Sequence, residues 1–217
     1  KGTKYLASAG VKSMTPTERV SYINTYAAIK PSPEIMKINA ANPEMLDRLN
    51  KSLLEAVNTI RANPFDYNAW VDSGVIVTAY GYPDDAERMY FNAVEIDPTG
   101  IVPWNNLADY YTKKQNYTKA LWAYDQLINL NVSRSVDYVH KFEVYAYFLK
   151  DERSAVALIE AGVKKLESPA KQATLWRALA EYYEFTNQKA KAREIYTKLL
   201  TLDPNNRTEY ESILRTL

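Results

Sequence analysis

Hydrophobic residues recur every three to four positions in much of the chain, which predicts a succession of amphipathic helices. Within this pattern, small, aliphatic and aromatic residues follow three tryptophans in the same order. The copies after Trp104 and Trp176 comprise Leu107, Ala108, Tyr111, Ala120 and Tyr124, and Leu179, Ala180, Tyr183, Ala192, Tyr196 and Pro204. A weaker copy after Trp70 comprises Ser73, Gly74, Val77, Ala86, Tyr90 and Pro98. This recurrence predicts a repeat protein.

The spacing of the tryptophans indicates the length of the repeat. Trp70 and Trp104 are 34 residues apart, and Trp104 and Trp176 are 72 apart, which is one unit of 34 plus one of 38. A divergent unit is therefore expected between the last two. The pattern resembles the tetratricopeptide repeat (TPR), whose period is about 34 residues. The resemblance implies an all-α fold, a right-handed α-solenoid of antiparallel helix pairs in a TPR-like superhelix.

The expected organisation has a repeat array flanked by other helices. In order, we expect a linker or frayed N-terminus (1–14), N-terminal helices with a degenerate leading half-repeat (15–64), the array (67–206), and a capping helix (207–217). The array divides into units 67–100, 101–134, 135–172 and 173–206, of which the third is divergent. The extra residues of the divergent unit are expected near Ser168 and Pro169, as a longer connection.

The N-terminal helices are predicted from their start signals. Thr15, Pro16 and Glu18 supply a capping hydroxyl, a proline at the first helical position and a glutamate three residues after the cap. A helix is expected from there to about Ile29. Similar signals are Ser32 with Pro33 and Asn42 with Pro43.

The signature residues are expected to hold the helices together. Small residues belong where two helix axes approach most closely, and aromatic rings fill the space between repeats, each contributing about 2 to 3 kcal/mol when buried. The predicted packing residues are Trp70, Gly74, Ala86, Tyr90, Trp104, Ala108, Tyr111, Ala120, Tyr124, Trp176, Ala180, Tyr183, Ala192 and Tyr196. Most of the 18 tyrosines are thereby interpreted as core rather than functional residues.

Composition argues against several classes of function. Lys and Arg (27) balance Asp and Glu (26) and are scattered, so no nucleic-acid partner is expected. The chain has no cysteine, and its single histidine, His140, has no partner set for a metal site or a catalytic triad. Asp84 and Asp85 suit a helix N-terminus. We therefore predict no enzyme activity, catalytic residue, metal or cofactor.

The resemblance also implies a ligand-binding surface. In the resembled family, successive first helices line a concave groove that receives a peptide or a partner helix. The corresponding positions are Asn68, Val71, Val75, Thr78 and Ala79, then Val102, Asn105, Asp109, Thr112 and Lys113, and finally Thr174, Arg177, Glu181, Glu184 and Phe185.

The charges at these positions limit the type of ligand. Some family members bind a C-terminal carboxylate with lysine and asparagine in the first repeat and lysine and arginine in the third. Such a clamp is not expected here, because the corresponding residues are Val71 and Val75 in the first unit and Val136 and His140 in the third. Carboxylates at Asp109, Glu181 and Glu184 would favour a basic or neutral ligand. A simple solvated charged face is the alternative.

Three functional hypotheses follow. The first is a non-enzymatic protein–protein interaction scaffold that binds a peptide or helix in the groove. The second is the soluble tail of a larger bacterial membrane protein or enzyme, such as a glycan polymerase or ligase, because the chain begins at Lys1 rather than methionine and non-repeat helices precede residue 64. The third is self-association through tyrosine-rich faces into a homo-oligomer.

No apolar run is long enough for a transmembrane helix, so this segment is not expected to insert into a membrane. The partner's identity and the cellular compartment stay open.

Replacing a small packing residue with tryptophan tests the proposed helix contacts. We expect Ala108→Trp or Ala180→Trp to unfold the array, because a well-packed core cannot accept so large a side chain. Thermal denaturation followed by circular dichroism measures the effect, and a melt identical to that of the parent would contradict the packing assignment.

Overall fold

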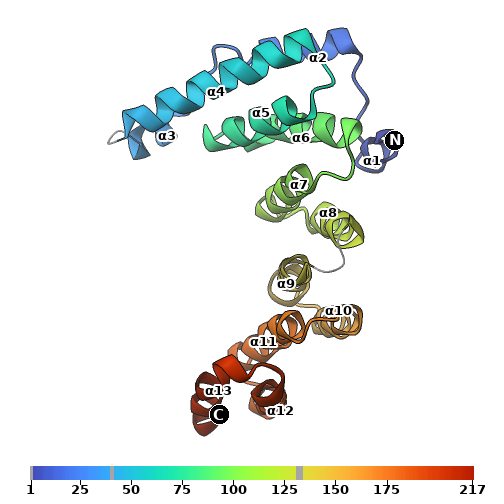
Figure 1. The fold of residues 1–217 in the computed structure, drawn as a ribbon, viewed down its shortest axis with the longest axis vertical. Helices are drawn as coiled ribbons and strands as arrows, with labels where there is room; N and C mark the ends of the chain where they lie inside the picture. The colour runs from blue at the N-terminus through green and yellow to red at the C-terminus, as the bar shows by residue number, and fades with distance from the viewer. Residues whose placement is uncertain (1, 40–41, 131–133) are drawn as a thin grey trace. The chain divides into compact units, whose positions relative to one another are not determined.

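The computed structural model describes residues 2–39, 42–130 and 134–217. Within these ranges the chain is helical with short connections and no strand (Figure 1). It divides into two compact units, Lys1–Lys114 and Gln115–Leu217, and the division falls inside the predicted second repeat. Lys1 of the predicted linker and residues 131–133 of the second repeat lie outside the described ranges. None of the described helices has the length and apolar character needed to cross a membrane.

The described residues of unit 1 form seven helices. They are α1 (Thr3–Ser8), α2 (Pro16–Asn24), α3 (Pro33–Ile38), α4 (Pro43–Ala62), α5 (Tyr67–Ala79), α6 (Pro83–Ile96) and α7 (Ile101–Lys113). The capping box of Thr15 and Glu18 forms as predicted, and the side chains of Ser32 and Asn42 cap α3 and α4. Helix α2 ends before the predicted Ile29, because the chain turns at Thr25 and brings the Ser32 N–H to the Tyr80 carbonyl, 2.8 Å away.

The first residues of unit 1 are more ordered than the sequence predicts. Thr3–Ser8 form helix α1 where we expected a linker or a frayed end. The Leu6 side chain is buried, and the Tyr5 ring lies edge-on to Trp104 with 5.3 Å between ring centroids. A helix this short is stable only through tertiary packing. Those partners lie far along the chain, so local periodicity does not predict them.

A buried ion pair attaches α2 to α6 in unit 1. Arg19 is almost fully buried, and its guanidinium donates to the Glu95 carboxylate at 2.6 Å. It also donates to the backbone carbonyl of Met14 at 3.3 Å. Such a pair fixes the position of α2, since either charge alone would be costly to bury. Sequence reasoning did not identify Arg19.

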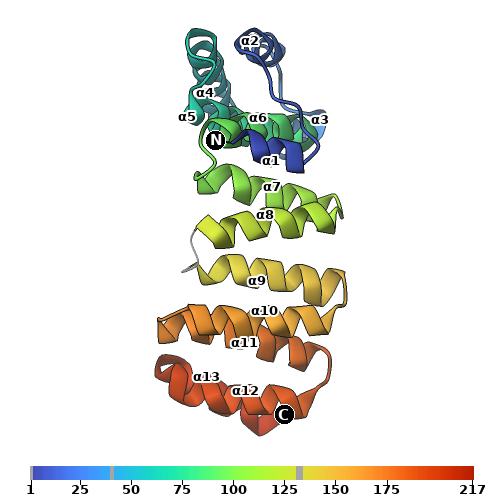
Figure 2. The same ribbon diagram turned by 90° about the vertical axis from the view of Figure 1, so that its right-hand side faces the viewer.

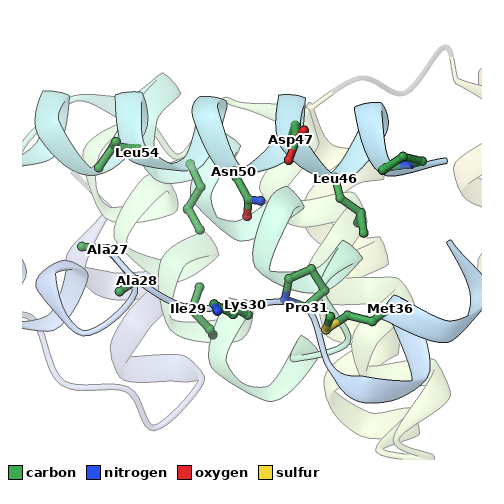
Figure 3. A pocket seen from close by; sticks show the side chains of 12 residues that line it. Ala27, Ala28, Ile29, Lys30, Pro31, Met36, Leu46, Asp47, Asn50 and Leu54 are labelled. Atoms are coloured by element: carbon green, nitrogen blue, oxygen red, sulfur yellow. The ribbon is translucent and has the colours of Figure 1, made fainter. Parts of the chain in front are cut away.

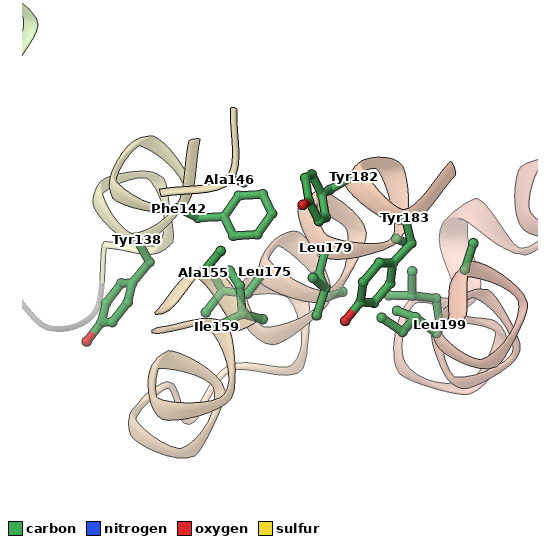
Figure 4. Packing of buried hydrophobic residues seen from close by; sticks show 14 of the residues in the cluster. Tyr138, Phe142, Ala146, Ala155, Ile159, Leu175, Leu179, Tyr182, Tyr183 and Leu199 are labelled. Carbon is green, nitrogen blue, oxygen red and sulfur yellow. The ribbon is translucent and has the colours of Figure 1, made fainter. Parts of the chain in front are cut away.

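Unit 2 contains the remaining helices, which Figure 2 shows in order along the unit. They are α8 (Tyr117–Leu130), α9 (Ser135–Glu143), a π-helix (Val144–Phe148), α10 (Glu152–Lys165), α11 (Pro169–Phe185), α12 (Lys189–Leu202), a short 3₁₀ turn (Pro204–Asn206) and α13 (Arg207–Thr216). Residues from α9 to α13 share one buried cluster, which includes Tyr196. Figure 4 shows further members, among them Tyr138, Phe142, Leu175 and Leu179.

The 34-residue period is visible in the starts of the first helices. Helices α5, α7, α9 and α11 begin at residues 67, 101, 135 and 169. Helix α11 has 17 residues, whereas α5 and α7 have 13 each. The four extra residues therefore form an additional turn at the start of α11. We expected these residues to lengthen the connection near Ser168, and the structure contradicts that expectation.

The additional turn changes the environment of Trp176. Trp70 and Trp104 are fully buried, and each indole N–H donates at 3.0 Å to the carbonyl of a proline six residues earlier, Pro64 or Pro98. The residue six before Trp176 is Ala170, which lies inside α11. Trp176 is only partly buried and its indole nitrogen has no hydrogen-bond partner. Trp176 still packs against the buried cluster of unit 2, as predicted, but it lacks the complete burial and the hydrogen bond of the other two tryptophans.

The turns between paired helices share one backbone conformation. Gly81, Gln115, Lys150 and Asn187 have φ of 88°, 58°, 54° and 57°, and each precedes its second helix by two residues. This left-handed conformation ends a helix and reverses the chain. Glycine adopts it without penalty, whereas other L-residues are disfavoured there by about 1 kcal/mol.

Glycine at the second of these turns should stabilise the protein. We expect Gln115→Gly to raise the free energy of unfolding by up to about 1 kcal/mol, because the strain at φ 58° is removed. The matched control, Glu194→Gly in the interior of α12, should lower it by about 1 kcal/mol. Urea denaturation measures both changes, and a destabilised Gln115→Gly variant would contradict this account.

Candidate functional site

The predicted groove positions lie on the surfaces of first helices in both units. In unit 1 the surface belongs to α5 and α7, and in unit 2 to α11. Most of these side chains are exposed or partly exposed. Val71 is the exception: it is only 8% exposed, so it belongs to the core and its assignment to the groove is wrong. Its neighbour on the same helix, Val75, is exposed.

A hollow of about 490 Å³ in unit 1 is lined by apolar side chains of α4 and the segment before α3 (Figure 3). Leu46 lies opposite Pro31 and Met36, and Leu54 lies farther along α4. Sequence reasoning missed this hollow, because it depends on how the segment 27–31 folds back beside α4. Its polar lining residues are Lys30, Asp47 and Asn50.

A second hollow in unit 1 does contain predicted groove residues. It has a volume of about 310 Å³ and lies between the C-terminal half of α5, the start of α6 and α7. Its lining residues are Thr78, Pro83, Tyr90, Asn106, Asp109, Tyr110, Lys113 and Lys114. We call it the α5–α7 hollow. Tyr110, which the repeat signature leaves unexplained, is part of this lining.

The charged side chains of the α5–α7 hollow are paired with one another. Lys113 binds Asp109 at 2.7 Å, and Lys114 binds Asp84 at 2.7 Å. Both pairs are solvent-exposed, so each contributes little to stability. The first pair nevertheless neutralises the carboxylate of Asp109, which we had expected to attract a basic ligand. The hollow consequently offers paired charges and neutral hydrogen-bonding groups.

Two tyrosines give the hollow its neutral donors and acceptors. The hydroxyl groups of Tyr90 and Thr78 lie 3.1 Å apart and share a hydrogen bond. Burial raises the pKa of both Tyr90 and Tyr110 to about 12, and nearby carboxylates, Glu87 and Asp84 in the case of Tyr110, add to the shift. Both phenols are therefore protonated at neutral pH and able to donate.

The corresponding surface of unit 2 differs in character. Arg177 bridges Glu181 at 3.0 Å and Glu209 of α13 at 2.6 Å. The carboxylate of Glu184 accepts a hydrogen bond from the hydroxyl of Tyr196. Phe185 is 76% exposed. The acids expected to attract a basic ligand are thus largely committed to intramolecular partners, and an aromatic ring is the most exposed feature.

The remaining predicted positions form no further site. Asn68 and Asn105 are exposed, and the hydroxyl of Thr112 donates to the Ala108 carbonyl at 2.8 Å. His140 is exposed, and its ring centroid lies 6.1 Å from that of Tyr124. In the described part of the chain, no three His, Asp or Glu side chains group in a way that could hold a metal ion.

In each unit, the described residues form repeated helix pairs with exposed first-helix surfaces, which is the organisation of an all-α helical-repeat fold. Residues 173–206, the predicted fourth unit, match the family model described as tetratricopeptide repeat. The crystal structure of MamA is similar, with a TM-score of 0.56 and 17% identity over 70% of this chain and 87% of that one. The family match covers residues 173–206, and the similarity to the MamA structure extends the shared fold over more of the chain.

Curated relatives are similar to parts of the chain. Human Superkiller complex protein 3 is 34% identical over 68 residues, which is 30% of this chain and 4% of that protein. Anaphase-promoting complex subunit 3 of Schizosaccharomyces pombe is 28% identical over 112 residues, which is 52% of this chain and 17% of that protein. The chain therefore spans only a small part of the length of these relatives.

The stability of unit 1 should depend on pH at values above the ordinary pKa of a tyrosine hydroxyl. The pKa of Tyr90 rises from 10.0 unfolded to about 12 in the folded protein. The unfolded state therefore loses its proton first, so the stability is complete below pH 10 and falls between about pH 10 and pH 12. We expect Tyr90→Phe to show a shallower loss across this window in urea denaturation. An equally steep loss in both proteins would contradict the assignment.

Proposed function

We propose that the protein is a non-enzymatic scaffold that binds a segment of a partner protein in the α5–α7 hollow. The observation that carries this proposal is the convergence of Thr78, Asp109 and Lys113, predicted from the repeat alone to face a ligand, on one concave surface of unit 1. A volume of about 310 Å³ accommodates one or two side chains of a bound segment.

The chemistry of the hollow favours a neutral, hydrogen-bonding segment. The Asn106 side-chain amide donates to the Val102 carbonyl at 2.9 Å, which leaves its oxygen to accept from a ligand. The Tyr110 hydroxyl donates to Asp84, which leaves its oxygen to accept from a ligand, and its ring supplies apolar contact. The paired Asp109 and Lys113 would hydrogen-bond polar groups of either sign at the rim. A strongly acidic or basic ligand would have to disrupt that pair.

The similarity to other proteins supports an interaction role in general terms. The two curated relatives are named as parts of complexes, the Superkiller complex and the anaphase-promoting complex. Repeat arrays of this type present several helices side by side, so one partner segment can contact more than one unit. The identity of the partner is set by the variable surface residues and not by the repeat signature.

Capture of partners from the source cell tests this proposal. Tyr110→Ala and Asp109→Lys should each reduce recovery of the specific partner about tenfold or more, because the first removes an aromatic contact in the hollow and the second disrupts the charge pair at its rim. The matched control is the charge reversal Glu194→Lys on second helix α12, which should leave recovery unchanged. Quantitative mass spectrometry of material bound to the full chain gives the measurement.

The comparison requires that the variants and the control are folded to the same extent as the parent. Thermal melts of all variants should match the parent, since Asp109 and Glu194 are exposed and Tyr110 is partly exposed. Equal recovery of every partner by parent, Tyr110→Ala and Asp109→Lys would refute binding at the α5–α7 hollow.

A further inference from the structure

We propose that a second surface, in unit 2, binds a partner segment that carries an arginine or lysine next to a large apolar side chain. The surface lies where α11 and the π-helix end. We call it the aromatic patch and define it by Tyr147, Phe148, Leu149 and Phe185. The inference rests on the proposed interaction role and adds the chemistry of a partner, at a site separate from the α5–α7 hollow.

The patch gathers large apolar side chains that folding leaves in solvent. Tyr147 is 36% exposed, Phe148 50%, Leu149 43% and Phe185 76%. Scattered single exposures of this kind are ordinary, whereas a contiguous group marks an interaction surface. Aromatic side chains in such a group are the residues that most often dominate binding energy at protein interfaces.

The rings of the patch are held in place by other aromatic rings. Tyr147 contacts Phe185 edge-on, with 5.6 Å between ring centroids, and contacts Tyr182 at 5.6 Å. Phe148 stacks on Tyr117 at 5.5 Å. Tyr182 is buried, and Figure 4 shows it beside Phe142 in the core of unit 2. The exposed rings are therefore pre-positioned on a rigid base, which lowers the entropic cost of binding.

A π-helix presents these residues. The Leu149 N–H donates to the Val144 carbonyl five residues earlier at 3.0 Å. The step from the start of α9 to the start of α10 is 17 residues, compared with 16 from α7 to α8, so the wider turn accommodates one extra residue. Single π-turns of this kind cost stability and occur frequently at functional sites. Here the wider turn places Phe148 and Leu149 at the surface.

Carboxylates beside the patch define the charge of the partner. Glu143 lies four residues before Tyr147 and Glu181 four residues before Phe185, so each carboxylate is one helical turn from a ring of the patch. Both carboxylates also add to the effect of burial in raising the pKa of the Tyr147 hydroxyl. Glu181 is paired with Arg177, whereas Glu143 forms no ion pair with a described residue. Lys150 is the cation that follows the patch along the chain. Aromatic faces beside a free carboxylate favour an arginine or lysine, through cation–π and ionic contact together.

The first experiment screens a random peptide library displayed on phage against the full chain. We expect the enriched peptides to carry arginine or lysine within a few residues of leucine, phenylalanine or tryptophan. A labelled synthetic peptide of the enriched sequence then gives affinities by fluorescence anisotropy. Replacing its basic residue with glutamate should weaken binding about tenfold or more.

Variants of the protein locate the binding site. Phe185→Ser, Phe148→Ser and Glu143→Lys should each weaken binding of this peptide about tenfold or more. Ile38→Ser is the matched control, because Ile38 is an exposed apolar residue of α3 in unit 1, outside both candidate surfaces, and it should bind like the parent. Thermal melts check that each variant stays folded, since Phe148 and Phe185 are at least half exposed.

Three results would overturn this inference. The first is that no peptide in the library binds the parent and Phe185→Ser differently. The second is that the enriched peptides lack a basic residue. The third is that the parent sediments as a dimer and Phe185→Ser sediments as a monomer. The last result would assign the patch to a second copy of the chain. Because Tyr110→Ala and Asp109→Lys report on the α5–α7 hollow separately, either proposal can fail while the other holds.

Discussion

The close approach of two antiparallel helices around an aromatic ring is the contact on which the rest of the fold depends. In the first repeat, a Cβ atom at Gly74 would come within 2.6 Å of the Tyr90 ring, so no larger residue fits without a shift. The ring fills the space that the missing side chain leaves. The distance between the two helices is thereby fixed, and with it the position of the side chains on their outer surface. Neither helix would be stable alone.

The tyrosines that fill these spaces also shape the candidate binding surfaces. The hydroxyl of Tyr90 reaches Thr78, and the hydroxyl of Tyr196 reaches Glu184, at equivalent positions of the first and fourth repeats. Both partners were predicted to face a ligand. A core residue therefore orients a groove residue directly, so packing and recognition are coupled, and a substitution of either tyrosine would alter both.

The two candidate surfaces use different chemistry within one repeat design. The α5–α7 hollow combines paired charges with neutral hydroxyl and amide groups. The aromatic patch combines exposed rings with a free carboxylate at Glu143. Repeat arrays permit this variety because the packing positions are separate from the variable ones. The two proposed surfaces would suit partner segments of different chemistry.

The sequence by itself determined the repeat, the order of its helices and the capped start at Thr15, because those features depend on residues a few positions apart. The tertiary structure decided that Trp176 is partly exposed, that Val71 is buried and that Asp109 is neutralised by Lys113. Periodicity assigns a residue to a helix face but does not specify its neighbours. Burial and charge pairing depend on those neighbours, and an additional turn in α11 is enough to change them.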